Sequence, residues 1–198
     1  MSSTTPSERT TTSAEAARPP KRERLIAAAL EEIHREGYAG TSLAKIADAA
    51  DVPIGNVYYY FKTKDDLLHA VLDEHIETVE EMLEAAEAND DPKQRILAFV
   101  EGLGATADDV AARGCPLGCL TQDLVRSGGD AAPASAFERQ LLWLEREFGS
   151  AGAKDPRSLA VHVMARTQGA ATMCHSLGDA QVLRTELDRL RGFLVDAL

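Results

Sequence analysis

The stretch from Thr41 to Lys64, TSLAKIADAADVPIGNVYYYFKTK, decides the fold. Its pattern predicts a short helix, a tight turn, a second short helix and the capped start of a long helix. The turn is expected at Asp51-Val52-Pro53, which combines residues that favour turns. The second helix is expected from Ile54 to Phe61, because Val57 and Phe61 then share a buried face at i, i+4 spacing.

Three consecutive tyrosines lie in this second helix. Tyr58, Tyr59 and Tyr60 cannot all face a core, because successive residues point about 100° apart around a helix. Lys62 and Lys64 follow them closely. An exposed face of phenol and ammonium groups is typical of a surface that contacts a phosphate backbone. The alternative is an ordinary solvated helix face, and the capped arrangement at a fixed spacing argues against it.

The composition of the 198-residue chain favours helices throughout. Apolar residues make up 44% of it, enough for a core, and aromatic residues only 5%. Alanine and leucine dominate, and the sequence has no runs of β-branched residues. No apolar stretch is long enough to cross a membrane, and the Ser/Thr-rich first twelve residues lack the apolar segment of a secretory signal. A cytoplasmic protein is therefore expected.

The net charge of -11 is unevenly distributed. Residues 1–64 carry 9 Lys or Arg and 8 Asp or Glu, a balance of +1, whereas residues 65–198 carry a balance of -12. A nucleic-acid interface needs a local basic face and not a basic total, so this charge does not exclude one near the N-terminus.

Apolar periodicity, caps and breaks predict nine helices and no strand. Thr41 or Ser42 caps the second helix, Thr63 and Asp66 form a capping box, and Pro92 begins a later helix. The expected helices span residues 21–36, 43–50, 54–61, 64–88, 92–113, 117–126, 135–148, 156–177 and 180–197.

The N-terminal part resembles the TetR family of bacterial transcriptional regulators over residues 22–70. The residues that carry the resemblance are Gly37-Tyr38, Thr41-Ser42, Ile46-Ala47, Ala50, Val52, Gly55, Val57-Tyr58-Tyr59-Tyr60-Phe61, Lys64 and Leu67.

The chain departs from the family pattern at three positions in the turn. Asp51 stands where glycine is usual, Pro53 where a capping serine is usual, and Ile54 where a polar residue is frequent. The operator sequence therefore cannot be carried over from the family.

The resemblance implies an all-α protein with three parts. Residues 1–20 would be a disordered tail, residues 21–64 a helix-turn-helix DNA-binding domain, and residues 65–198 a ligand-binding and dimerisation domain. It also implies a homodimeric regulator, in most relatives a repressor, that a small molecule releases from a palindromic operator. The basic end of the tail, Arg18 to Arg24, is either an arm that touches phosphates or a solubilising segment.

In the helix-turn-helix geometry, the N-terminal part of the second helix faces base edges, and flanking residues contact phosphates. Asn56 is the best candidate to contact a base, because an amide pairs bidentately with adenine. The expected DNA-binding residues are Thr41, Ser42, Lys45, Pro53, Ile54, Gly55, Asn56, Tyr58, Tyr59, Lys62 and Lys64.

The regulatory part is expected to enclose a mainly apolar pocket with a few polar groups. Gln168 and His175 lie seven residues apart and would share one face of a helix. The candidate ligand-binding residues are Phe99, Leu103, Cys115, Leu117, Cys119, Trp143, Met164, Gln168, Met173 and His175. The dimer seam is expected on the last two helices, with Val163, Gly169, Ala170, Ala171, Leu183, Leu187, Leu190 and Leu194 as candidates.

The cysteines allow other hypotheses. Cys115 and Cys119, four residues apart at a helix start, suggest a thiol-based redox or electrophile sensor, and the alternative is two small buried apolar residues. A metal site of both with His175 lacks a closed set of four ligands, so no metal is expected. An enzyme with a Cys–His nucleophile lacks an oriented base and an oxyanion site, so no catalytic residue or cofactor is expected.

Overall fold

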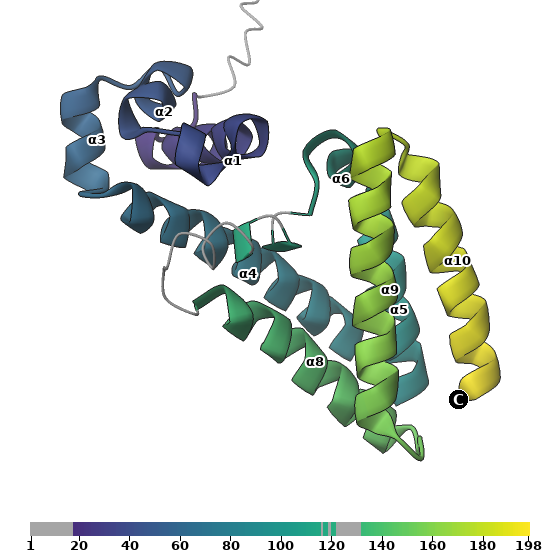
Figure 1. The fold of residues 1–198 in the computed structure, drawn as a ribbon. Coiled ribbons are helices and arrows are strands. Elements are labelled where there is room, and N and C mark those ends of the chain that lie inside the picture. Colours follow the sequence, from purple (N-terminus) through teal and green to yellow (C-terminus); the bar gives the residue numbers. More distant parts are fainter. Residues whose placement is uncertain (1–17, 116, 119, 122–131) are drawn as a thin grey trace, which may run out of the picture.

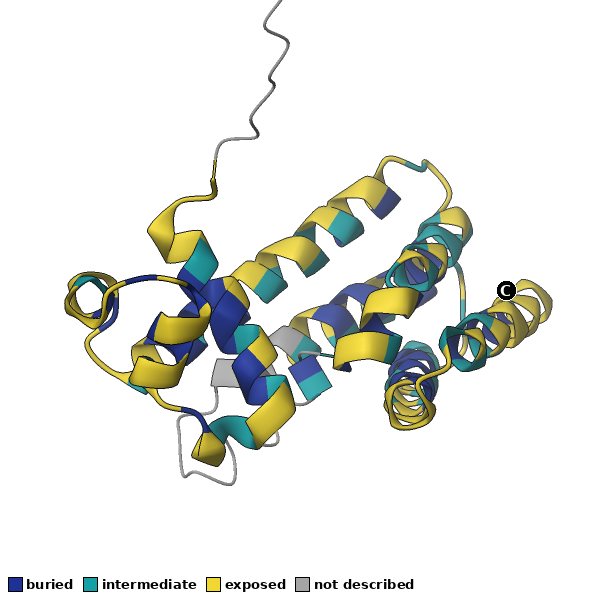
Figure 2. Cartoon of the chain, turned by 90° about the horizontal axis from the view of Figure 1, so that it is seen from above, coloured by how far each residue is buried: buried dark blue, intermediate teal, exposed yellow. Residues whose placement is uncertain are grey.

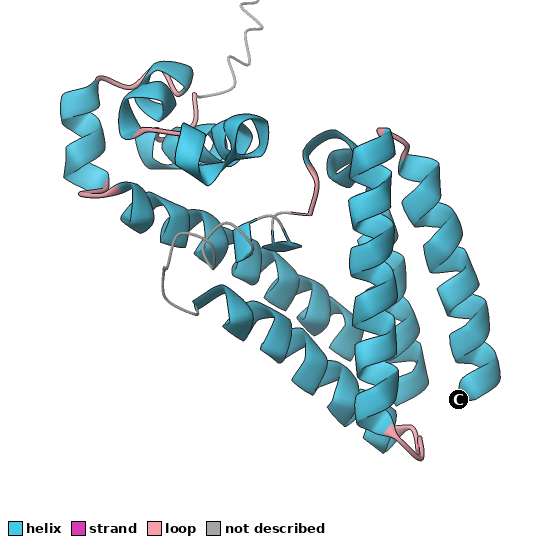
Figure 3. Ribbon diagram, viewed as in Figure 1, coloured by secondary structure: helices cyan, strands magenta, loops and turns pink. Residues whose placement is uncertain are grey.

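The computed structural model describes residues 18–115, 117–118, 120–121 and 132–198, and of residues 132–136 only the backbone. This part of the chain contains nine helices and no strand, as the sequence predicts (Figures 1 and 3). The helices are α1 (Lys21–Gly40), α2 (Leu43–Ala49), α3 (Ile54–Tyr60), α4 (Lys64–Glu87), α5 (Pro92–Ala105), α6 (Ala107–Arg113), α8 (Ala132–Ser150), α9 (Pro156–Leu177) and α10 (Ala180–Ala197).

The first three helices form a small unit, here called the three-helix unit, at one end of the molecule (Figure 1). Gly37 interrupts α1 with a φ of 70°, which a residue with a side chain rarely adopts, and so turns the chain toward α2. Ser42 caps α2, since its side chain accepts a hydrogen bond from the Lys45 amide. Val57 and Phe61 are buried, as their spacing predicts.

Helix α4 leaves the three-helix unit and extends to the C-terminal helices (Figure 1). Its start is fixed by the expected capping box: the Thr63 side chain accepts from the Asp66 amide, and the Asp66 carboxylate accepts from the Thr63 amide. Leu67, Leu68 and Val71 on its first turns pack into the core of the three-helix unit. The burial pattern in Figure 2 shows the buried faces of these helices turned toward one another.

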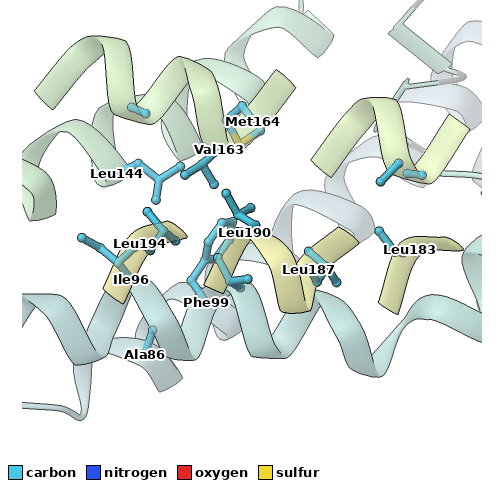
Figure 4. Packing of buried hydrophobic residues seen from close by; sticks show 14 of the residues in the cluster. Ala86, Ile96, Phe99, Leu144, Val163, Met164, Leu183, Leu187, Leu190 and Leu194 are labelled. Atoms are coloured by element: carbon cyan, nitrogen blue, oxygen red, sulfur yellow. The ribbon is translucent and has the colours of Figure 1, made fainter. Parts of the chain in front are cut away.

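A second core joins the far part of α4 to α5, α6, α8, α9 and α10. Leucines at regular spacing on α10 fill its centre: Leu183, Leu187, Leu190 and Leu194 (Figure 4). Phe99 from α5 and Val163 from α9 contact the same centre and are fully buried. The seam leucines and Val163 thus pack within one subunit, and their expected place at a dimer seam is wrong.

The expected helix over residues 92–113 is divided at Thr106. Thr106 has φ and ψ of -89° and 2°, and its amide and hydroxyl both bond to the Leu103 carbonyl. Two nearby glycines, Gly102 and Gly104, weaken the helix on its N-terminal side. The following helix, α6, begins at Ala107.

Two other boundaries differ from the prediction. Helix α8 begins at Ala132, three residues before the expected start. Of the helix predicted over 117–126, residues 117–118 and 120–121 are helical, and residues 119 and 122–126 lie outside the described part.

Candidate DNA-binding surface and internal cavity

Helix α3 presents four large side chains to solvent. Ile54 is 43% exposed, Tyr58 49% and Tyr59 79%, whereas Val57 and Phe61 on the opposite side are buried. Tyr60 is also exposed, at 39%, and its ring lies edge-on to that of Tyr59 with 5.0 Å between centroids. The hydrophobic core therefore does not explain Ile54, Tyr58 and Tyr59, and they form a continuous outer face with the start of the helix.

The residues at the start of α3 are accessible as expected. Pro53 and Gly55 are exposed and Asn56 is partly exposed. A Cβ placed on Gly55 would meet no atom within 4 Å, so the backbone there has open space in front of it. This geometry lets a flat or grooved partner approach the helix closely.

The lateral edges of this face are polar. Ser42 and Lys45 are exposed at the start of α2. The Lys45 ammonium donates to the Gly40 carbonyl at 2.9 Å and lies 3.6 Å from a carboxylate oxygen of Glu36. The exposed Lys62 donates to the Tyr58 carbonyl at the end of α3. Both ammonium groups keep further donors for another partner.

Lys64 holds the fold together and does not extend into solvent. Its ammonium donates to the carbonyls of Tyr38 and Thr41 at 2.7 and 3.0 Å and lies 3.9 Å from the centre of the Tyr38 ring. Burial lowers the pKa of Lys64. Two of its three donors are thus used within the protein, so the expected phosphate contact by Lys64 is not supported.

Thr41 is likewise turned inward, with only 4% of its surface exposed. Its hydroxyl lies within hydrogen-bonding distance of the carbonyls of Glu32 and Gly37, at 3.2 and 2.9 Å. The Thr41 hydroxyl thereby satisfies backbone carbonyls in the last turns of α1. Its side chain is removed from the candidate surface, and Ser42 remains.

A clasp of two arginines around Asp51 was not foreseen from the sequence. Arg24 donates to the carbonyls of Ala50 and Asp51, at 3.0 and 3.3 Å, and so holds the turn between α2 and α3. Arg18 pairs with the Asp51 carboxylate, and this hydrogen bond lowers the pKa of Asp51. Asp51 itself has a φ of 49°, a left-handed conformation that aspartate tolerates better than most residues. The basic segment before α1 therefore lies beside the turn.

A cavity of about 280 Å³ lies where the three-helix unit meets the C-terminal helices. Leu30 and His34 of α1 form one wall, and α4, α5, α6, α8, α9 and α10 supply the others. Of the expected ligand-binding residues, Leu103, Cys115, Leu117 and Gln168 line it.

The other expected residues lie elsewhere. Phe99, Trp143 and Met164 belong to the second core, where the Phe99 and Trp143 rings lie 5.6 Å apart at an angle of 48° and Trp143 donates to Glu87. Met173 is 57% exposed on the outer side of α9. His175 lines a neighbouring cavity together with Gln168, on one face of α9 as expected.

Two histidines in the cavity wall were missed. Burial, with smaller effects from the positive charges of His175, Arg113 and His75, lowers the pKa of His34 from 6.5 to about 4. Both ring nitrogens of His34 are buried without a hydrogen-bond partner in the described protein. Burial also lowers the pKa of His75. Their positions on the apolar side of two helices give no local sign of a cavity in the sequence.

The cysteines form no closed cluster in the described residues. Cys115 is half-buried on the wall of both cavities, and Cys174 is buried in the second core, where burial raises its pKa. Cys119 lies outside the described residues. Among the residues that the structure describes, no group of three His, Cys, Asp or Glu is suited to hold a metal ion, and no helix has the length and apolar content to span a membrane.

The uncharged state of His34 predicts a stability that depends on pH. The unfolded chain takes up a proton on this residue near pH 6.5, but the folded protein only near pH 4. Between these values the unfolded state binds more protons, so the free energy of unfolding falls as the pH is lowered. From pH 7 to pH 5 this component amounts to about 2 kcal/mol, and His34→Leu is expected to remove it.

Urea unfolding of wild type and His34→Leu at both pH values checks this. Carboxylates with a lowered pKa contribute equally to the free energy of unfolding of both proteins, so their contribution cancels in the comparison. His75→Leu should also reduce the loss of stability between pH 7 and pH 5. An equal loss of stability in wild type and His34→Leu would contradict the role of His34.

Comparisons with known proteins agree with this geometry. The model of the family described as "Bacterial regulatory proteins, tetR family" matches residues 25–71, which contain α2, α3 and the start of α4. The transcriptional regulator BetI of Stenotrophomonas maltophilia is 36% identical over 86 residues, 42% of this chain and 44% of the relative. The transcriptional repressor NemR of Escherichia coli is 31% identical over 107 residues, 52% of this chain and 51% of the relative.

The structural likeness extends further than the sequence likeness. A TetR transcriptional regulator from Legionella pneumophila superposes with a TM-score of 0.77 at 22% identity, over 92% of this chain and 99% of that one, which shows a common fold. This chain spans about half the length of the curated relatives described above. The matched N-terminal segment and the shared all-helical fold agree: residues 25–71 match the TetR family of bacterial regulatory proteins, and the chain has the fold of a TetR transcriptional regulator.

Proposed function

We propose that this protein binds an operator in duplex DNA as a homodimer, acts as a repressor, and is released when a small molecule fills its internal cavity. The exposed outer face of α3 carries this proposal. A seven-residue helix that buries Val57 and leaves Tyr59 79% exposed is built to contact a partner. One matched relative is named a transcriptional repressor, which supports the direction of regulation.

In this proposal α3 enters the major groove and α2 lies across the backbone. Asn56 contacts a base edge, and Ile54 packs against a thymine methyl group. Gly55 permits close approach, since nothing lies within 4 Å of its Cβ position. Other exposed groups bind phosphates and position the protein without reading sequence. The proposed interface is Ser42, Lys45, Pro53, Ile54, Gly55, Asn56, Tyr58, Tyr59 and Lys62.

The proposed dimer uses the outer sides of α9 and α10. Every fourth residue of α9 from Val161 to Leu177 is small or apolar and exposed. Such a stripe allows two helices to approach closely, and a two-fold axis would place it against its own copy. The stripe consists of Val161, Ala165, Gly169, Met173 and Leu177, and Phe193 and Val195 of α10 are also exposed.

The position of the cavity suggests how ligand binding reaches the DNA. Leu30 and His34 of α1 form part of its wall, so a ligand touches the three-helix unit directly as well as α4. A ligand that binds better when α1 is displaced shifts the population toward a state in which the two α3 helices of a dimer no longer fit successive grooves. A coupling of about 1–3 kcal/mol is typical of such regulation.

Two substitutions on α3 are expected to affect DNA binding in different ways. Asn56→Ala should lower affinity for the operator by about 5- to 150-fold and relax the preference for one base pair, because it removes a base contact. Tyr59→Phe should weaken binding to all duplexes alike, because it removes a hydroxyl that meets phosphate. Fluorescence anisotropy with duplexes selected from the DNA upstream of the gene, or from a random pool, at two salt concentrations measures both.

Gln94→Ala, at an exposed position of α5, is the matched control and should bind like wild type. Lys64→Ala is unsuitable as a contact variant, since it also breaks the bonds to Tyr38 and Thr41. A wild-type protein that shows no salt-dependent affinity for any duplex would refute the proposed function.

A charged residue introduced into the exposed stripe of α9 tests the proposed dimer interface. A Cβ placed on Gly169 would meet no atom of its own subunit within 4 Å, so Gly169→Glu should leave the subunit folded. Two like charges would then face each other across the axis, and the dimer dissociation constant should rise on the order of a hundredfold. Sedimentation equilibrium measures it, with Gln94→Glu as the control. An unchanged dissociation constant would place the seam elsewhere.

A thiol response is the second candidate function, because Cys115 lies on the wall of both cavities. Covalent change of this thiol would alter the cavity wall directly. If Cys115→Ser is still released from DNA by oxidants or electrophiles, this candidate fails, whereas release by a cavity ligand would be unaffected by that result.

A further inference from the structure

The cavity contains polar groups of two kinds, and the difference between them limits what it can bind. Groups of the first kind already form hydrogen bonds or ion pairs within the protein. The hydroxyls of Thr78, Thr106 and Thr167 each lie 2.9 to 3.0 Å from a backbone carbonyl of their own helix or turn. The charged pair in the wall, Arg113 and Asp109, is bonded to itself.

The second kind has no partner among the described residues. It consists of the amides of Gln140 and Gln168 and the imidazoles of His34 and His75. Gln140 is the clearest case, because only 4% of its surface is exposed and it lines the cavity. The amide atoms of Gln140 are not among the fully buried side-chain atoms that lack a partner, so they reach the space of the cavity, where a ligand can bond to them.

All four uncommitted groups are uncharged at neutral pH. Burial lowers the pKa of both histidines, that of His34 to about 4, and the two amides do not titrate. The charges of Arg113 and Asp109 offset each other at the exposed edge, and Glu31 lies 4.0 Å from Arg113. An ionised ligand would lose its hydration here without meeting an uncompensated opposite charge.

The rest of the wall is apolar. Side chains of six helices and of Leu117 enclose the space, and none of them offers a hydrogen bond: Leu30, Val79, Met82, Leu103, Val110, Leu117, Ala171 and Leu183. A volume of about 280 Å³ is at the small end of ligand sites. The occupant is thus small, and most of its surface is hydrocarbon.

We infer that this cavity takes an uncharged, mainly apolar molecule with one hydroxyl or carbonyl group, which the Gln140 amide binds. This inference rests on the proposal that the cavity is the effector site. Gln140 selects the polar group of the ligand, because an amide both donates and accepts and is otherwise left unpaired in the wall. The site discriminates against acids and amines by their charge.

One test needs no ligand. Gln140→Leu replaces an amide that faces the cavity without a hydrogen bond to the described residues by an apolar group of similar size, so it should raise the midpoint of thermal unfolding by about 2–4 °C. Gln94→Leu, at an exposed position of α5, makes the same chemical change and should not raise it. An unchanged or lowered midpoint for Gln140→Leu would show that the amide is already satisfied, and would overturn the inference.

The second test uses four probes with one apolar body: 4-propylphenol, 4-propyltoluene, 4-propylbenzoate and 4-propylbenzylamine. Their binding to the full-length protein is measured by isothermal titration calorimetry at pH 7.5. The phenol should bind at least about tenfold more tightly than the toluene, and more tightly than either charged probe. In Gln140→Leu the phenol and the toluene should bind alike.

Each other result counts against the inference. A charged probe that binds best refutes the neutral class, and a preference for the phenol that survives in Gln140→Leu refutes the role of Gln140. Failure of both neutral probes to bind refutes the site. DNA release is measured separately: if the phenol binds as expected but leaves DNA affinity unchanged, the ligand class stands and the proposed effector role of the cavity fails.

Discussion

The hydrogen bonds of the Lys64 ammonium hold the start of α4, which follows α3 directly, against the end of α1. They connect the first residue of α4 to the carbonyl of Tyr38 in the last turn of α1 and to that of Thr41, which lies between α1 and α2. A cation at a helix N-terminus is unfavourable, so these bonds and the Tyr38 ring must offset both the helix dipole and the loss of hydration. Together with the adjacent Thr63 cap, these bonds join the start of α4 to the three-helix unit.

The cavity lies at the other contact between these parts. Its wall is formed by α1, α4 and the helices of the second core. The shape of the cavity therefore depends on the position of the three-helix unit relative to the C-terminal helices. His34 is left there with two unpaired ring nitrogens, a cost that the surrounding packing has to offset. Packing favours this position of the three-helix unit, and the unpaired nitrogens of His34 disfavour it. A ligand therefore needs only a small difference in affinity between two positions of the unit to shift the population from one to the other.

The sequence predicted the elements better than the contacts between them. Capping at Thr63 and the spacing of Val57 and Phe61 follow local rules, and the structure has both. The cavity joins residues from α1 to α10, and apolar residues such as Phe99 have the same periodicity whether they fill a core or line a pocket. Lys64 was expected to bind phosphate at the start of the long helix, and only the fold shows the two carbonyls to which it donates.

Because α1 forms part of the cavity wall, it affects how the N-terminal unit and the C-terminal helices of two different regulators can be joined in a chimera. Leu30 and His34 belong by sequence to the N-terminal unit, yet they complete the cavity of the C-terminal helices. A chimera that joins this N-terminal unit to another sensor, or this sensor to another N-terminal unit, exchanges part of the pocket together with the operator preference. Such a chimera should therefore not be joined at the start of α4, because Leu30 and His34 of α1 must come from the same protein as the C-terminal helices.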